Sequence, residues 1–120
     1  NTGRKDLILN VNVSLVKKIY PMNTTLKQQE KVNKSTSFLG NAYLYRGAPN
    51  DYKKAKKWFE TSLKSNDKTI VREAYLGLGT IYYDGLGVRR NVYQDRYFIG
   101  KSCDMGLEDA CATYAKLFIQ

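Results

Sequence analysis

The chain has no histidine among its 120 residues. This absence removes the most common metal ligand, the usual general base and the usual activator of a serine or cysteine nucleophile. Two cysteines without histidine do not supply the ligand set of a structural zinc site. A Gly-x-Ser-x-Gly nucleophile motif is also missing from the sequence. We therefore expect no catalytic residues, no metal site and no cofactor.

The sequence also lacks a long apolar run. No stretch approaches the roughly 20 residues that are needed to cross a bilayer. The first residues show neither an initiating methionine nor the basic and apolar regions of a signal peptide. We interpret the chain as a mature, exported product from which a targeting segment has been removed.

Acidic residues are few relative to basic ones. Lysine and arginine number 20 against 11 aspartates and glutamates, so the formal net charge is +9. This excess favours a partner with an acidic surface. The basic residues are dispersed and match no nucleic-acid fingerprint, so nucleic acid is a weaker prediction. The densest group is Lys53, Lys54, Lys56 and Lys57, which we expect to steer the partner or, alternatively, only to solvate a helix face.

A repeated pattern is the most informative feature that is present. The stretch 78–85, Leu-Gly-Thr-Ile-Tyr-Tyr-Asp-Gly, is echoed by Leu-Gly-Asn-Ala-Tyr-Leu-Tyr-Arg-Gly at 39–47. A helical run with a large aromatic, Trp58 or Phe98, follows each copy. Such a period indicates stacked helical hairpins. The predicted fold class is all-α, a short right-handed α-solenoid of about two repeats and a terminal helix.

The predicted boundaries divide the chain into an N-terminal capping segment, 1–25, and a repeat domain, 26–120. The apolar residues of the first segment fit both a strand and a helix, and both interpretations stay open. In the repeat domain we expect five helices. Three have approximate bounds of 26–46, 52–64 and 108–119; between them, one starts near Thr69 and ends at Gly85-Leu86-Gly87, and one starts after Asn91 and ends at the Met105-Gly106 turn. Asp51 and Asn91 are the expected N-caps of the second and fourth helices.

The pattern resembles the SEL-one-like repeat, a relative of the tetratricopeptide repeat, over about residues 35–120. The second copy keeps Leu78, Gly79, Tyr82, Gly85, Gly87, Val88, Lys101 and Gly106 of the family pattern. The first copy keeps Leu39, Gly40, Tyr43, Asp51, Lys54, Ala55 and Trp58. The second copy departs from the pattern at Gln94-Asp95, where the family usually has Lys-Ala.

The two cysteines, Cys103 and Cys111, are eight positions apart. In one continuous helix their Cα atoms would be about 12 Å apart, beyond the reach of a disulfide. Gly106 interrupts the helix between them, so the two cysteines can face each other across a turn. Secreted, cysteine-containing members of the repeat family have a similar spacing, which implies a bridge and a periplasmic or secreted location. Two free thiols in a cytosolic protein remain the alternative.

The resemblance implies a non-catalytic protein-binding module. Small exported proteins of this kind are similar to periplasmic immunity proteins, which hold a secreted antibacterial effector, often a phospholipase, inactive. An envelope signalling regulator or an adaptor that binds a host protein is the alternative. A β-lactam-binding or β-lactam-hydrolysing enzyme is a third hypothesis, which the missing histidine disfavours.

The candidate partner contacts come from the first helix of each hairpin, which lines the concave face in tetratricopeptide-type stacks. On this analogy we expect Asn41, Tyr45, Thr80 and Tyr83 to contact the partner. The other large aromatics of the pattern, Tyr43, Trp58, Tyr82 and Tyr97, are predicted to pack in the core.

Overall fold

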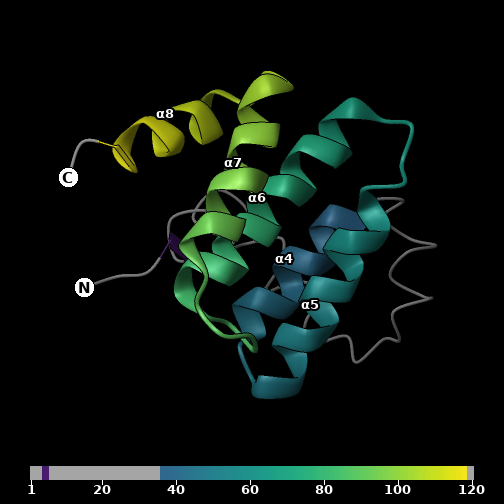
Figure 1. The fold of residues 1–120 in the computed structure, drawn as a ribbon. Helices are drawn as coiled ribbons and strands as arrows, with labels where there is room; N and C mark the ends of the chain where they lie inside the picture. The colour runs from purple at the N-terminus through teal and green to yellow at the C-terminus, as the bar shows by residue number, and fades with distance from the viewer. Residues whose placement is uncertain (1–3, 6–35, 119–120) are drawn as a thin grey trace.

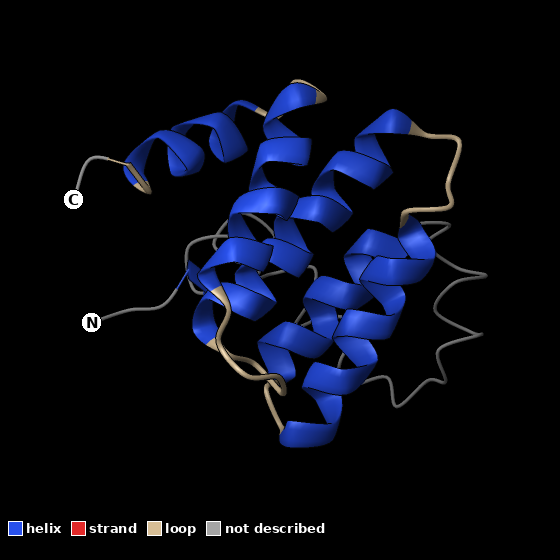
Figure 2. Ribbon diagram, viewed as in Figure 1, coloured by secondary structure: helices blue, strands red, loops and turns tan. Residues whose placement is uncertain are grey.

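The structure is a computed structural model that describes Arg4, Lys5 and residues 36–118. All regular elements of this part are helices, so the predicted all-α class is confirmed there (Figures 1 and 2). The helices are α4 (Thr36–Arg46), α5 (Pro49–Ser62), α6 (Lys68–Asp84), α7 (Val92–Asp104) and α8 (Glu108–Lys116). None of these helices is both long and apolar enough to cross a membrane. The rest of the predicted capping segment and of the first helix lies outside the described residues.

The helix boundaries follow local capping. The Asn91 side chain accepts hydrogen bonds from the backbone N–H groups of Tyr93 and Gln94, both at 3.1 Å, which confirms the predicted cap of α7. The predicted cap of α5 at Asp51 is wrong, because the helix already begins at Pro49. Proline suits the first turn of a helix, where its missing N–H has no helical partner. Asp51 lies in that turn and accepts a hydrogen bond from the backbone N–H of Ala48 at 3.2 Å.

The five helices pack in chain order as a stack of hairpins. Each helix contacts the next along the chain, and α4 also contacts α6 (Figure 1). Short turns of two to seven residues join them, so consecutive helices run back along each other. This arrangement is that of a small helical-hairpin solenoid.

Phe59 of α5 is at the centre of the core and is fully buried. Its ring lies against two glycines, Gly40 of α4 and Gly77 of α6. A Cβ atom at either glycine would lie 2.5 Å from the ring, closer than real contacts allow. The absence of a side chain at these two positions therefore lets three helices meet around one aromatic ring. The surrounding buried residues include Leu44, Ala55, Ala74, Leu78 and Ile81.

The second hairpin repeats this packing with a smaller side chain. Ile99 of α7, forty residues after Phe59, is fully buried against Gly79 of α6. Phe98 is half-buried, and its ring lies 6.0 Å from that of Tyr75 and 5.9 Å from that of Tyr82. The predicted packing role of Tyr82 therefore agrees with the structure.

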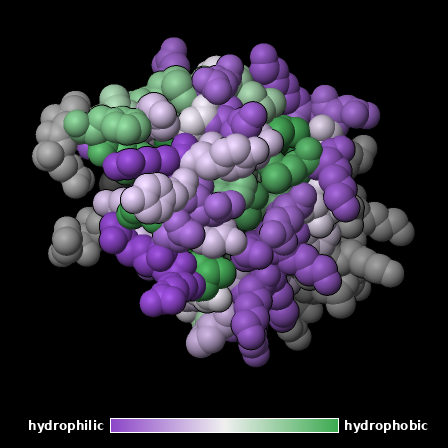
Figure 3. Space-filling model, viewed as in Figure 1, coloured by the Kyte–Doolittle hydropathy of each residue, from purple (hydrophilic) through white to green (hydrophobic). Residues whose placement is uncertain are grey.

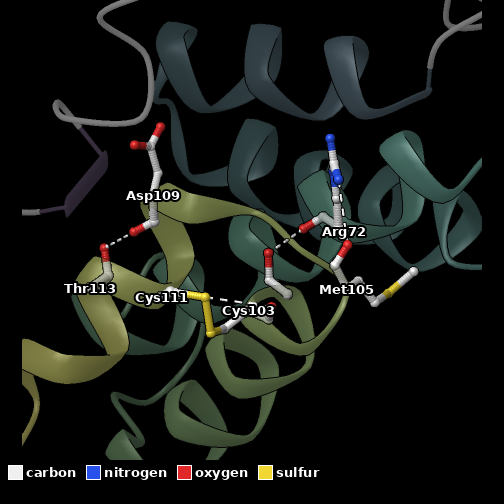
Figure 4. Close-up of a disulfide and its surroundings, with 7 residues drawn as sticks. Arg72, Cys103, Met105, Asp109, Cys111 and Thr113 are labelled. Atoms are coloured by element: carbon white, nitrogen blue, oxygen red, sulfur yellow. Dashed lines mark hydrogen bonds between the residues drawn. A yellow bond between two sulfur atoms is a disulfide. The ribbon is translucent and has the colours of Figure 1, made fainter.

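The last turn places the two cysteines opposite each other (Figure 4). Gly106 has a positive φ of 94°, which favours glycine, and its N–H donates to the Cys103 carbonyl at 2.8 Å. Cys103 at the end of α7 and Cys111 in α8 form a disulfide with Cα atoms 4.5 Å apart. The predicted pairing is therefore present, and it fastens α8 to α7.

Substituting Gly77→Ala tests the packing around Phe59. We expect a loss of about 1–3 kcal/mol in the free energy of unfolding, because the new methyl group displaces a ring held from both sides. Urea denaturation of Gly77→Ala, Phe59→Leu and the double variant measures the coupling. Leucine leaves room for the methyl group, so the double variant should lose less than the sum of the two single losses. Additive losses would show that the ring and the glycine do not constrain each other.

Replacing both cysteines by alanine tests the disulfide. The chain-entropy relation for so short a loop gives a loss of roughly 2–3 kcal/mol in unfolding free energy. The native protein should show no thiol that iodoacetamide alkylates, by intact mass, and two after reduction. Two alkylated thiols in unreduced protein, or unchanged stability of the double variant, would contradict the bridge.

Candidate functional site

The predicted partner contacts on α4 and α6 are less accessible than expected. Thr80 is fully buried, and its hydroxyl donates to the Leu76 carbonyl at 2.9 Å. This prediction is corrected, because a side chain enclosed by the helix stack cannot meet a partner. Asn41 is half-buried, and Tyr45 is half-buried against the core. These two residues keep only part of their surface for contact.

Tyr83, the fourth of these residues, is already engaged. Two guanidinium groups lie over its ring, that of Arg4 at 4.2 Å and that of Arg90 at 5.1 Å from the ring centroid. Arg90 also donates through Nε to the Tyr83 carbonyl at 2.9 Å. Tyr83 therefore belongs to an intramolecular site rather than to an open concave surface.

The predicted lysine group forms a basic face on α5. Lys53, Lys54 and Lys57 are exposed, and hydrophilic side chains cover this part of the molecule in Figure 3. Lys56 is half-buried and donates to Glu60 at 3.0 Å, a hydrogen bond that raises the pKa of Lys56. Three of the four lysines thus remain available to attract an acidic surface.

Three large aromatic residues on α7 and just after α8, which sequence reasoning missed as surface residues, are exposed. Tyr93 and Tyr97 of α7 are 78% and 55% exposed, and Phe118 after α8 is 57% exposed. The Arg96 guanidinium lies 4.9 Å from the Phe118 ring, and the Lys101 ammonium lies 5.6 Å from the Tyr97 ring. We call Tyr93, Tyr97 and Phe118 the aromatic face.

Tyr97 was predicted to pack in the core, and this prediction is wrong. The neighbouring Phe98 fills the core position, and Tyr97 contacts it only edge-on, with ring centroids 5.5 Å apart. Tyr93 and Tyr97 are four residues apart, so a helix places them on the same side. The spacing of two tyrosines and Lys101 was the signal available in the sequence.

The most enclosed polar contact is an ion pair between Arg4 and Asp95. Asp95 of α7 is fully buried, and Arg4 is 6% exposed. The guanidinium meets the carboxylate through two parallel contacts, Nη1 to Oδ1 and Nη2 to Oδ2, the second at 3.0 Å. Such a bidentate pair fixes the arginine in both position and orientation.

The backbone of Arg4 and Lys5 is also hydrogen-bonded to the helices. Asp84, the last residue of α6, accepts the N–H of Arg4 through Oδ1 at 3.2 Å and the N–H of Lys5 through Oδ2 at 2.9 Å. The Lys5 ammonium donates to the Tyr52 hydroxyl at 3.1 Å. We call Tyr52, Tyr83, Asp84 and Asp95 together the Arg4 site.

The positions of Asp84 and Asp95 follow from the helical repeat and from the end of α6. Asp95 is forty residues after Ala55, which is the buried residue at the matching position of the first hairpin. Asp84 precedes Gly85, whose φ of 69° ends α6 and turns the chain toward Arg90. The sequence signal was the departure at Gln94-Asp95, but it did not reveal a partner eighty or more residues away.

Burial raises the pKa of Asp95 above its ordinary value. The hydrogen bonds and positive charge of Arg4 lower that pKa and so offset part of the rise. Asp84 adds to the rise, and Arg90 opposes it. Since the folded state holds the Asp95 proton more tightly, this group stabilises the fold at acid pH, and that contribution is lost as pH rises through its raised pKa.

Comparisons with known proteins give no relative for this chain: no protein-family model matches, and neither a curated protein nor a solved structure matches significantly. Among residues 36–118 with Arg4 and Lys5, no group of three acidic or cysteine side chains could hold a metal ion.

The Arg4–Asp95 pair predicts an asymmetric double-mutant cycle. Arg4→Ala should lower the unfolding free energy by about 3 kcal/mol at neutral pH, because it leaves a buried carboxylate unpaired. Arg4→Ala with Asp95→Ala should recover most of this loss, since the matching position of the first hairpin is an alanine. Without Arg4 the Asp95 pKa rises further, so the loss should shrink toward about pH 3.5. Urea titrations at neutral pH and at about pH 3.5 measure the unfolding free energies of wild type and both variants. Equal losses in the single and double variants would contradict the pairing.

Proposed function

We propose that this chain is a non-catalytic protein-binding module whose partner docks on the aromatic face. The exposure of Tyr93, Tyr97 and Phe118 is the observation that carries the proposal. Tyrosine rings bury a large area at a small cost in rotamer entropy, and they are enriched where interfaces gain most of their free energy. Large rings exposed on one helix face and beside α8 are typical of such a surface.

The charge around these rings favours an acidic partner. Arg96 and Lys101 stack beside Phe118 and Tyr97, and both are cations that a facing carboxylate can pair with. Three exposed lysines on α5 add long-range attraction. The net charge of +9 acts in the same direction and should speed association at low ionic strength.

The finer proposal is that the partner is a secreted antibacterial effector and that the chain is its periplasmic immunity protein. Its resemblance to SEL-one-like repeats, its short helical frame and its basic charge support a one-partner inhibitor. The disulfide between Cys103 and Cys111 supports an oxidising compartment such as the periplasm. The effector is expected to be a toxin-like exported protein, such as a phospholipase, encoded beside this chain.

A growth-protection assay tests this proposal. The neighbouring toxin-like protein is directed to the periplasm of a test bacterium, alone and together with this chain. The wild-type chain should restore colony counts, and the purified pair should bind. Tyr93→Ala with Tyr97→Ala should weaken binding by about 100-fold, because two anchor rings are removed, and should abolish protection.

Two matched variants separate docking from folding. Tyr93→Phe with Tyr97→Phe keeps both rings and should retain binding within about tenfold of wild type. Lys64→Ala with Thr69→Ala alters exposed residues near the turn between α5 and α6 and should bind like wild type. Full binding by the variant Tyr93→Ala with Tyr97→Ala would show that the partner does not dock on the aromatic face. No binding or protection by the wild-type chain would overturn the immunity proposal.

A further inference from the structure

The Arg4 site contacts its occupant in three different ways. A buried carboxylate takes the arginine fork, an aromatic ring stacks on the guanidinium, and a second carboxylate takes two consecutive backbone N–H groups. Side-chain and main-chain contacts together are how a protein recognises a peptide segment. The arrangement therefore has the composition of a peptide-binding site, with residues 4–5 bound in it.

The chemistry selects arginine over lysine. Asp95 presents both carboxylate oxygens to two guanidinium nitrogens, a geometry that only a planar fork satisfies. The Tyr83 ring, 4.2 Å from the guanidinium carbon, adds a stacking contact that an ammonium makes less well. Asp84 accepts hydrogen bonds only from the backbone, from two successive N–H groups. Proline has no N–H, so it does not fit at the position after the arginine.

The occupant comes from a part of the chain far from the helices that hold it. Among the described residues, the buried apolar side chains lie between Leu39 and Ala110, and residues 4–5 contribute none of them. The segment is 79–91 residues distant in sequence from the carboxylates it contacts. Asp95, in turn, is a buried charge at a position that the first hairpin fills with Ala55. A buried carboxylate is costly without a cation, so the ionised form of Asp95 needs a positive partner, which Arg4 supplies.

We propose that the Arg4 site is a binding site for peptide segments that contain arginine followed by a non-proline residue, and that Arg4-Lys5 is its displaceable resident ligand. A lysine after the arginine improves the fit, because Lys5 reaches the Tyr52 hydroxyl. A partner that carries such a segment competes with Arg4 for Asp95. This site is distinct from the aromatic face, since Asp95 is roughly 200° around α7 from Tyr93, so the proposal does not rest on the proposed function.

The test uses the full chain with Arg4→Ala, which empties the site, and a synthetic peptide, Asn-Thr-Gly-Arg-Lys-Asp-Leu, that copies the first seven residues. Isothermal titration calorimetry should give a dissociation constant between about 10 μM and 1 mM, as expected for a short, flexible ligand. The same peptide with alanine or lysine in place of arginine should bind at least tenfold more weakly. The wild-type chain should also bind the arginine peptide more weakly, because Arg4 competes at high effective concentration.

The control is the double variant Arg4→Ala with Asp95→Ala, which keeps the helices and loses the carboxylate. It should not bind the arginine peptide, although its far-ultraviolet circular dichroism should match wild type. If Arg4→Ala alone proves poorly folded, Arg4→Lys serves in its place, since it keeps the charge but not the fork. Equal binding of the peptide to the double variant, or equal binding of the arginine and lysine peptides to the single variant, would overturn the proposal.

Discussion

The contact of Phe59 with two glycines is the interaction on which the described fold depends. The ring can reach Gly40 and Gly77 only because neither residue has a side chain, and in doing so it brings α4, α5 and α6 into contact. The remaining helices extend the same stack, with Ile99 on Gly79 in the next hairpin. This close approach also helps to position the Arg4 site, because α6 carries Tyr83 and Asp84 and packs against α7.

The two hairpins pack in the same way, but they differ at one buried position. The matching positions of Ala55 and Asp95 are both fully buried, but one is apolar and the other is ionisable. A charge in a core position is costly unless it is paired, and here the pairing cation comes from near the start of the chain. Departures from a local rule are expected at sites that bind something. The same helix carries exposed tyrosines on its opposite side, so α7 presents two different surfaces.

The sequence predicted the helical repeat well, because its landmarks act locally or at a fixed spacing. Asn91 caps α7 as predicted, and two residues of the repeated pattern have packing roles: Leu78 is buried in the core, and Gly79 lies against Ile99. Cys103 and Cys111 pair because Gly106 turns the chain between them.

The candidate sites were harder to predict. Thr80 was predicted to be exposed and is buried, whereas Tyr97 was predicted to be buried and is exposed. The repeated pattern alone does not say which side of α6 or α7 a neighbouring helix covers. The Arg4 site joins residues from distant parts of the chain, and no local sequence pattern predicts such a contact.

Native-state hydrogen exchange followed by NMR tests the packing of Phe59 against Gly40 and Gly77 most directly. The amides of α6 around Gly77 and Leu78 should be the most protected in the protein, opening only with global unfolding. Exchange there as fast as in α8 would contradict the account.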